Sequence, residues 1–309
     1  MHGQNPYNCP ANDRSKQITM PCSWERIPFG STNLRVTPLG LGSSYGLEAR
    51  DVERAVERGL NYIYWGSQRR PSYAEAVRNL GPSKREELVL VVQSYTRAAA
   101  FMRGSLERAL RELRTDYTDL LLLGWWNEPP PRKIVDAALE LKRAGLTKGI
   151  LISCHHRPSF VRYIEDAAYD GIMVRYNAAH PGAEDEVFPH LAIRRPATVA
   201  YTATRWKALL NPKYLPADEP PPRASDCYRF VLTNPFVDVC LTGPANAGEL
   251  DEAMAALDRG PLSDDEMAWM RRVGKHVHTT ANVQQFSKLV RVSDRVVDAV
   301  SRLSRWVER

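Results

Sequence analysis

The chain has 309 residues, of which 25% are charged and 43% hydrophobic, and its formal net charge is +6. This length suits one large α/β domain around a single core. Lysine and arginine are spread among aspartate and glutamate, without the basic run of a nucleic-acid-binding surface, and no apolar run is long enough to span a bilayer. These features argue against a nucleic acid or a membrane as partner.

The cysteines and the N-terminal residues indicate in which cellular compartment the protein is expected. Five cysteines form an odd set without a CxxC pair, namely Cys9, Cys22, Cys154, Cys227 and Cys240. Neither a disulfide framework nor a zinc site is indicated. The opening MHGQNPYNCPANDRSKQ lacks the apolar stretch of a signal peptide. We therefore expect a cytoplasmic protein, either a monomer or a small homo-oligomer.

Short apolar runs alternate with amphipathic segments along most of the chain. Eight strands are predicted, at Val36 to Leu41, Leu60 to Tyr64, Leu88 to Val92, Asp119 to Leu123, Gly149 to Ile152, Gly171 to Val174, Thr198 to Ala200 and Val237 to Leu241. Helices are predicted between them, among others at Ala49 to Arg58, Met102 to Leu113, Ile134 to Ala144 and Gly248 to Ala256. Near-continuous apolar strands are typical of a sheet that is buried on both faces.

This alternation predicts a (β/α)8 barrel, the TIM-barrel fold, over residues 25–278. A doubly wound open sheet is disfavoured because no GxGxxG follows an early strand. A polar tail is expected over residues 1–24. Apolar residues at helical spacing predict a helical extension over 279–309.

Six segments, in the right order, resemble the aldo-keto reductase superfamily over about three quarters of the chain. They are PFGSTNLRVTPLGLGSSYG, GLNYIYWGS, MRGSLERALRELRTDYTDLLLL, GLTKGILIS, RYNAAHP and VDVCLTGPAN. The first resembles the family's opening, in which a short hairpin precedes the first barrel strand. The resemblance implies an oxidoreductase that uses a nicotinamide dinucleotide.

The chain departs from this family where the resemblance places the catalytic tetrad. The aspartate, tyrosine, lysine and histidine positions hold Tyr64, Arg69, Gln93 and Gly124. Tyr73 takes the tyrosine position if the loop is shifted, but without a lysine partner its phenol ionises near pH 10 and is a poor acid at neutral pH. We therefore expect a divergent member that does not use the usual proton-transfer mechanism.

The cofactor positions are judged separately from the tetrad. The resemblance assigns Tyr201 to the nicotinamide platform, whereas Cys154 and Met173 replace two amide partners. A turn before a helix N-terminus, TGPAN, suits a phosphate. The residues assigned to a cofactor are Ser153, Tyr201, Thr202, Gly243, Asn246 and Glu252. Gly243 and Glu249 stand where the family has cationic residues that bind the 2′-phosphate of NADP, so NAD is favoured over NADP. The alternative is that the protein binds no cofactor.

Polar and aromatic residues follow the predicted strands, at the barrel end where such folds place their sites. His155, Arg175, Tyr64 and Gln93 are the catalytic candidates, because histidine titrates near neutrality and a charge at a strand end needs a partner or a ligand. Substrate-binding candidates are Trp65, Arg69, Trp125, Trp126, Asn177 and Arg205, since arginine and flat rings suit a planar, sugar-like or anionic substrate.

Each candidate also has a structural alternative. The tryptophans would then plug the barrel mouth, and Arg175 would pair with Glu184 or Glu186. Of the adjacent His155 and His156, at most one is expected to reach the cavity, because neighbouring side chains point to opposite faces. Cys154 is either a nucleophile beside a histidine or a buried small hydrophobe. A metal site from the histidines is disfavoured, because no carboxylate converges with them.

Three functions are compatible with these residues. The first is a divergent aldo-keto-reductase-like oxidoreductase in which Arg175, Tyr64, Gln93 or a histidine stabilises oxyanion charge. The second is a non-redox isomerase, lyase or hydrolase that acts on a sugar-like or anionic compound. The third is a non-catalytic sensor of a metabolite or nucleotide. Retained Tyr201 and Glu252 favour the first, and the amide partners lost at Cys154 and Met173 favour the others.

Overall fold

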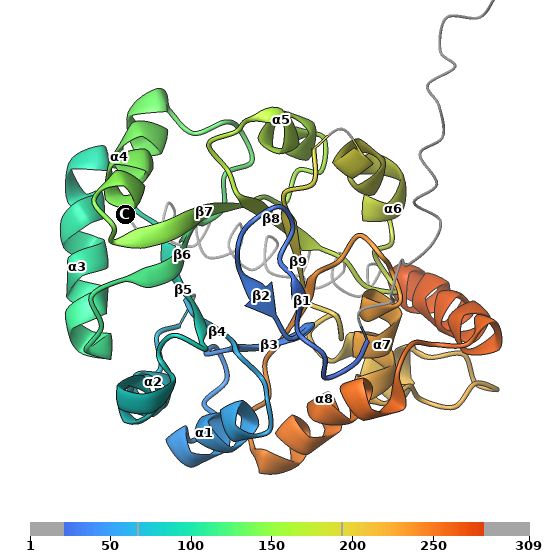
Figure 1. The fold of residues 1–309 in the computed structure, drawn as a ribbon. Coiled ribbons are helices and arrows are strands. Elements are labelled where there is room, and N and C mark those ends of the chain that lie inside the picture. Colours follow the sequence, from blue (N-terminus) through green and yellow to red (C-terminus); the bar gives the residue numbers. More distant parts are fainter. Residues whose placement is uncertain (1–21, 67, 193, 281–309) are drawn as a thin grey trace, which may run out of the picture.

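The computed structural model describes residues 22–66, 68–192 and 194–280, which form a closed parallel barrel ringed by helices (Figure 1). This confirms the predicted (β/α)8 fold. The tail predicted over 1–24 and the extension predicted over 279–309 lie outside the described residues, except at their inner ends.

The barrel strands follow one another in chain order and all run parallel. They are β3 (Leu39–Gly42), β4 (Tyr62–Trp65), β5 (Val89–Ser94), β6 (Thr118–Leu123), β7 (Thr147–Ser153), β8 (Gly171–Arg175), β9 (Ala197–Tyr201) and β10 (Val239–Thr242). β10 pairs with β3, with Cys240 opposite Leu39, and this pairing closes the sheet. Their carboxyl ends therefore meet at one mouth.

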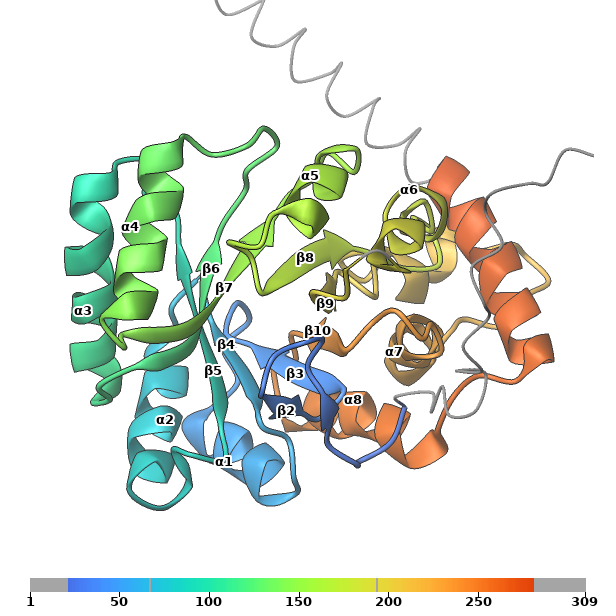
Figure 2. The same cartoon turned by 45° about the horizontal axis from the view of Figure 1, so that its top comes forward.

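Helices cover the outside of the barrel (Figures 1 and 2). They are α1 (Ala49–Glu57), α2 (Pro71–Lys84), α3 (Met102–Leu113), α4 (Arg132–Arg143), α5 (Ser159–Glu165), α6 (Ala183–Glu186), α7 (Ala224–Leu232) and α8 (Ala247–Arg259), with short 3-10 turns η1 (Ala99–Phe101), η2 (Phe188–Ala192), η3 (Ala208–Leu210) and η4 (Pro212–Tyr214). The bounds of α3 agree with the prediction. Each apolar stripe faces the strands, as Leu106, Ala109 and Leu110 do in α3.

A final helix over 264–280, orange-red in the figures, lies beside α6 and α7. Its Gly274 packs against the backbone of Ala178, so closely that a Cβ would overlap the Ala178 carbonyl. Further along, Arg205 Nη1 donates to the Val277 carbonyl at 2.9 Å. The helix is thus attached to the loops that follow β8 and β9.

A hairpin of β1 (Ile27–Pro28) and β2 (Arg35–Val36) lies across the barrel end opposite the mouth, in front of the barrel centre in Figure 1. Phe29 and Val36 are fully buried against the inner strand residues. The single strand predicted from Val36 to Leu41 was therefore wrong in extent. Pro38 has no N–H for a ladder, and the Thr37 N–H donates instead to Asn61 Oδ1 at 2.8 Å.

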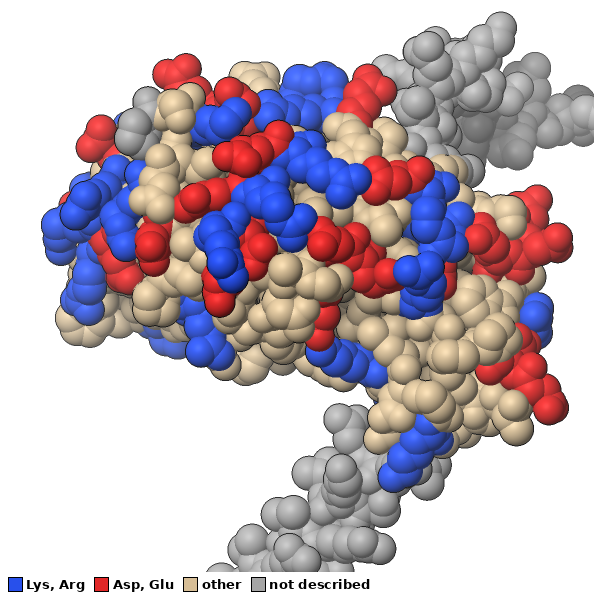
Figure 3. Space-filling model, turned by 90° about the horizontal axis from the view of Figure 1, so that it is seen from below, with Lys and Arg blue, Asp and Glu red and all other residues tan. Residues whose placement is uncertain are grey.

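Alternate strand residues fill the barrel. Val91, Leu122 and Leu151 are fully buried inside it, and the residues two positions later on each strand face the mouth. On the surface seen in Figure 3, Lys and Arg are interspersed with Asp and Glu, as the sequence predicts for a solvated, mixed-charge surface.

Candidate functional site

A cavity of about 1020 Å³ lies at the carboxyl ends of the strands and is called the mouth cavity here. Eight of the residues predicted for the site line it, namely Tyr64, Trp125, His155, Tyr201, Thr202, Gly243, Asn246 and Glu252. Its size is that of pockets for drug-sized ligands and cofactors. The loops after β3, β6, β7, β9 and β10 supply its walls, together with the first turns of α7 and α8.

Four rings form a row across the mouth. Edge-to-face contacts join Tyr95 to Trp125 at 6.1 Å between ring centroids, Trp125 to His155 at 5.3 Å, and His155 to Tyr201 at 6.0 Å. The Tyr201 hydroxyl and His155 Nδ1 are 3.2 Å apart, within hydrogen-bond distance. Burial, and then the charge of Arg175, lower the pKa of His155. His155 is therefore neutral at pH 7, as a donor and acceptor for a ligand requires.

His156 and Cys154 turn away from the cavity. His156 Nδ1 lies 2.9 Å from Ser159 Oγ, and the Cys154 thiol donates to the His156 carbonyl at 3.0 Å. Burial raises the pKa of Cys154 to about 11, so its thiol is protonated at neutral pH. Of the two adjacent histidines only His155 lines the cavity, and Cys154 has the position and charge state of a buried small hydrophobe.

Tyr64 and Gln93 occupy the inner end of the mouth. The Tyr64 hydroxyl donates to Gln93 Oε1, and both side chains are buried. Gly124, on the next strand, has no room for a Cβ because the Gln93 amide fills that space. Tyr73 lies in α2 outside the barrel, where its hydroxyl donates to the Gly42 carbonyl at 2.9 Å. Burial raises the pKa of Tyr73 well above its ordinary value, so a shifted loop does not bring this tyrosine to the cavity.

The far end of the cavity is the N-terminus of α8. Asn246 caps the helix by accepting the Glu249 N–H at 3.0 Å. Glu249 in turn accepts the Ala245 N–H at 3.0 Å and pairs with Lys207 at 2.6 Å. These contacts lower the pKa of Glu249. A carboxylate therefore already occupies the position that favours anions.

Glu252 and Ser153 also have partners within the protein. Glu252 accepts from Ser225 Oγ at 2.6 Å and pairs with Arg223 at 2.8 Å. Ser153 Oγ accepts the Trp125 N–H at 3.0 Å. Met173, on the neighbouring strand, is 7% exposed and lines the cavity. Ser153 thus fixes the loop that carries Trp125.

Five predicted substrate residues are not among those that line the cavity. Trp65 is fully buried on the outer side of the barrel, with Arg69 over its ring at 5.0 Å. Trp126 packs against Arg97 at 3.9 Å. The Asn177 amide donates to the Thr202 carbonyl at 2.9 Å, and Arg205 is 5% exposed beneath the final helix. Their observed contacts are structural ones, within and between loops.

Arg175, the last residue of β8, lies beside the cavity and opposite Tyr201 of β9. Its strand neighbour two positions earlier, Met173, lines the cavity, whereas Arg175 is not among the lining residues. Strand alternation directs both side chains to the same side of the sheet. Its charge contributes to the lowered pKa values of His155 and His180. The mouth is therefore electropositive at this point.

Several cavity residues were not assigned to the site from the sequence, including Tyr45, Lys207, Arg223 and Tyr228. Two signals were available. Tyr45 follows the first barrel strand, at the functional end of such folds. The others belong to the long segment after β9 or to the helix that follows it, and long loops in compact domains are commonly functional.

Several residues with a strained backbone conformation lie at the mouth of the barrel. Trp125, Thr202, Trp206 and Lys207 all line the cavity, and all have positive φ, at 58°, 60°, 51° and 67°. Such values cost of order 1–3 kcal/mol each for residues other than glycine and recur where function requires a fixed loop.

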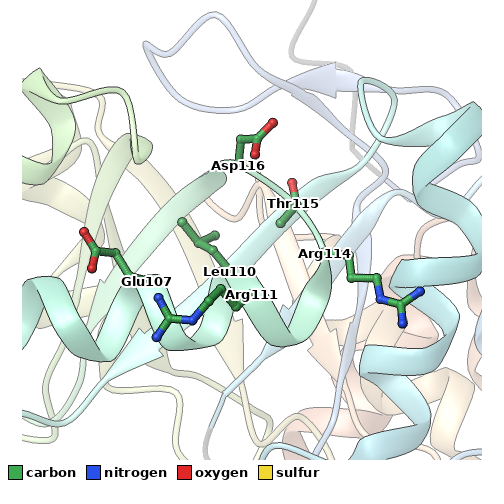
Figure 4. A pocket seen from close by; sticks show the side chains of 6 residues that line it. All are labelled: Glu107, Leu110, Arg111, Arg114, Thr115 and Asp116. Atoms are coloured by element: carbon green, nitrogen blue, oxygen red, sulfur yellow. The ribbon is translucent and has the colours of Figure 1, made fainter.

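A second, smaller depression of about 310 Å³ lies away from the mouth, at the carboxyl end of α3. Figure 4 shows Glu107, Arg111 and Arg114 pointing outward around it. None of the predicted site residues lines it.

Metal ligands do not converge within residues 22–66, 68–192 and 194–280, where no group of three His, Cys, Asp or Glu side chains is arranged to hold a metal ion. No helix in those ranges is long and apolar enough to cross a membrane. The four cysteines in the same ranges are free and buried.

The molecule is a closed (β/α)8 barrel with an aromatic-lined cavity at the carboxyl ends of its strands, the end where such barrels place their sites. The family model described as "Aldo/keto reductase family" matches residues 29–226, more than half of the chain. The chain therefore belongs to the aldo/keto reductase family, as the sequence motifs predicted. No curated protein sequence matches the chain.

Solved aldo-keto reductases share this fold. The holo form of an enzyme from Bacillus halodurans is 19% identical, with a TM-score of 0.69 over 81% of this chain and 96% of the other. An enzyme from Klebsiella pneumoniae, in complex with NADP and acetate, is 22% identical, with a TM-score of 0.69 over 81% of this chain and 95% of the other. A Klebsiella pneumoniae complex with NADPH has the same identity, TM-score and coverage.

Proposed function

We propose that the protein is an oxidoreductase that binds a nicotinamide dinucleotide in the mouth cavity. The observation that carries this proposal is the position of Tyr201, whose ring lines the cavity at the end of β9 while the α8 N-terminus lies at the other end. A flat ring suits the nicotinamide, and a helix N-terminus suits a phosphate. Both parts of a dinucleotide therefore have suitable partners, and the related Klebsiella enzyme binds NADP.

The charges at the α8 end favour NAD over NADP. Glu249 is an anion held at this end by Lys207 and by its own helix. A 2′-phosphate placed near it meets like charge, which costs affinity. A ribose hydroxyl group has no such penalty, so we propose that NADH binds more tightly than NADPH.

The reaction would not use the usual tetrad. We propose that Tyr64, Arg69, Gln93 and Gly124 replace its aspartate, tyrosine, lysine and histidine. Tyr64 and Gln93 hydrogen-bond to each other, and Gly124 has no side chain to donate a proton. A dinucleotide held by Tyr201 and the α8 N-terminus would supply or accept the hydride. His155 and Arg175, which lie beside Tyr201, would then stabilise the developing oxyanion of the substrate.

Calorimetric titration of the nucleotide-stripped protein with NADH and with NADPH tests the proposal. We expect micromolar binding of NADH, weaker binding of NADPH, and at least a tenfold loss in Tyr201→Ala. Phe101→Ala serves as the control, because Phe101 is 71% exposed and is not a cavity residue. Absence of binding of either dinucleotide at millimolar concentration would refute the proposal.

A second candidate is a non-redox enzyme or a metabolite sensor on the same cavity. The observation that favours it is the end of β7, where Ser153 Oγ already accepts the Trp125 N–H and Cys154 turns to the His156 carbonyl. These residues stand where the family binds the carboxamide. NADH consumption with a panel of carbonyl compounds separates the two, because only the first candidate consumes NADH.

A further inference from the structure

Arg175, at the end of β8, is a partly buried cation. Among residues 22–66, 68–192 and 194–280 it makes no hydrogen bond and no ion pair. The two carboxylates expected to pair with it are engaged elsewhere. Glu184 binds both terminal nitrogens of Arg271 at 3.0 Å, and Glu186 binds Arg157 at 2.7 Å. A charge withdrawn from water without a partner is unfavourable unless a ligand supplies the opposite charge.

Two guanidinium groups contribute positive charge here, because Arg175 is close enough to Arg205 to add to the effect of burial in lowering its pKa. His155 and His180 have lowered pKa values, of about 3 for His180, and are neutral at pH 7. Arg205 is directed to the Val277 carbonyl under the final helix. Tyr201, on the neighbouring strand, is an uncharged phenol, because burial raises its pKa. The planar fork of Arg175, which has neutral His155, His180 and Tyr201 as its other polar neighbours, can bind a carboxylate through two parallel hydrogen bonds.

An independent feature, Trp125, provides a flat apolar surface against His155, the histidine on which the Arg175 charge acts. Its indole ring is 60% exposed, lines the cavity and lies against His155. The backbone of Trp125 has φ 58°, a conformation that bulky residues rarely adopt. Arg97 holds the loop by donating to the Gly124 carbonyl at 2.9 Å and the Trp125 carbonyl at 2.8 Å. The indole is therefore presented by a supported loop.

We propose that the substrate of the mouth cavity is a carboxylate with a flat apolar body, whose anion binds Arg175 and whose body packs on Trp125. This names the substrate class of the oxidoreductase proposed above and rests on that proposal for the reaction, although not for the binding. His155 is a neighbour of both groups, because its ring contacts Trp125, and burial and then the charge of Arg175 lower its pKa. The carbonyl of such a substrate would reach His155 and Tyr201.

Calorimetry with benzoate as the probe tests this class, on the full chain with and without saturating NADH. Benzyl alcohol is the neutral comparison, and inorganic phosphate is the alternative anion. We expect benzoate to bind, and benzyl alcohol and phosphate to bind at least tenfold more weakly. Equal binding of benzoate and benzyl alcohol, or tighter binding of phosphate, overturns the proposal.

Substitutions test which residue binds the carboxylate and which residue packs on the ring of the probe. Arg175→Met should weaken benzoate at least tenfold and leave benzyl alcohol unchanged, Arg175→Lys should retain part of the affinity, and Trp125→Ala should weaken both compounds. Arg132→Met is the matched control, because Arg132 is 70% exposed on α4 and pairs with Asp136. Unchanged benzoate affinity in Arg175→Met overturns the proposal. Should that variant fail to fold, the comparison of the two probes on the unaltered protein decides.

The two proposals fail in different ways. Arg175-dependent benzoate binding without any dinucleotide binding refutes the oxidoreductase and supports the carboxylate site. Dinucleotide binding without benzoate binding refutes the carboxylate site alone.

Discussion

Glu249 connects two loops across the cavity, by its pair with Lys207 at 2.6 Å and its contact with the Ala245 N–H. The side chain of Glu249 is 37% exposed and that of Lys207 60%, so the pair itself contributes little to folding. Its importance is electrostatic, because it fixes an anion beside the helix N-terminus.

Replacement of this anion should change the cofactor ratio. In Glu249→Gln the negative charge is gone and Lys207 is released, so NADPH should gain about five- to tenfold over NADH, roughly 1 kcal/mol. Dissociation constants for both dinucleotides measure the ratio. Asp251→Asn, on the same helix and with its side chain 56% exposed, is the control and should leave the ratio unchanged. An unchanged ratio in Glu249→Gln would remove the electrostatic argument for NAD.

Two glycines within helices differ in the space around them. Gly274 lies against the Ala178 backbone, whereas Gly104 in α3 has no atom within 4 Å of the point that a Cβ would occupy. Alanine is the better helix former by about 1 kcal/mol at an open position. At a closed one, overpacking costs about 1–3 kcal/mol.

The same substitution should therefore have opposite effects. Gly274→Ala is expected to destabilise the protein by about 1–3 kcal/mol, because the final helix must move off the β8 loop. Gly104→Ala should stabilise it by about 0.5–1 kcal/mol. Urea unfolding of both variants beside the parent measures the difference. A stabilising Gly274→Ala would show that the final helix does not pack as described.

The final helix also depends on a buried arginine of α7. Arg229 binds both oxygens of Glu266 at 2.7 Å, donates to the Gly260 carbonyl at 2.7 Å, and is 4% exposed. Its hydrogen bonds lower the pKa of Glu266 to about 2. The arginine therefore joins α7, the end of α8 and the final helix.

Replacement of Arg229 should strongly destabilise the folded protein. Arg229→Met leaves Asp226 and Glu266 without this partner and should cost about 3–5 kcal/mol of unfolding free energy. Arg272→Met, on the final helix but with a side chain 61% exposed, should cost less than about 1 kcal/mol. Thermal and urea unfolding measure both, and equal effects of the two would contradict the role of the Arg229 network.

For the molecule as a whole, His180 couples folding to pH. It lies in ring contact with His278 at 5.1 Å, and its Nδ1 is 3.4 Å from Asn177 Oδ1. Burial, with the charges of Arg175, Arg205 and Arg157, lowers its pKa from 6.5 to about 3. Because the folded pKa is depressed, the unfolded chain binds more protons between these values. Stability is therefore present above pH 6.5 and is lost as the pH falls toward 3.

His180→Asn should reduce this acid sensitivity. One histidine accounts for a slope of at most about 1.4 kcal/mol per pH unit between pH 6 and 4, and the variant should lose that part of the slope. Urea unfolding across this pH range measures it. His276→Asn, an exposed histidine on the final helix, should keep the parent slope. If the unfolding free energy of His180→Asn depends on pH as steeply as that of the parent protein, protonation of His180 does not account for the acid sensitivity.

The fold followed from the sequence because each barrel strand is a short apolar run bounded by helical segments. Only strand ends shifted, and only the Val36 to Leu41 strand was divided, because its pairing partner Ile27 lies in a hairpin that apolar periodicity does not reveal. Strand registers place Tyr64 inside the barrel and Trp65 outside it. The sequence does not show which of the two faces inward. In a strand that is buried on both faces every residue is apolar, so no alternation distinguishes the inner side from the outer side.

The site was predicted less completely for a related reason. Arg205 is held by the Val277 carbonyl, 72 residues along the chain, so no local pattern reveals that it lies beneath a helix. By contrast, His155, Tyr201 and Asn246 line the cavity, and their positions depend only on the end of a strand or the start of a helix. Predictions of this kind succeed where the position is set by the fold and fail where it is set by a distant contact.

The packing of Tyr45 on Gly243 also constrains how the sequence can change over evolutionary time. A Cβ at residue 243 would overlap the Tyr45 ring, so a lysine or arginine there is accommodated only after Tyr45 has been replaced or has moved. Conversely, loss of Tyr45 alone would uncover the turn without adding a cation. A cation at residue 243 would therefore need the Tyr45 side chain to move or to be replaced, so the loop after β3 limits which side chains the turn after β10 can carry.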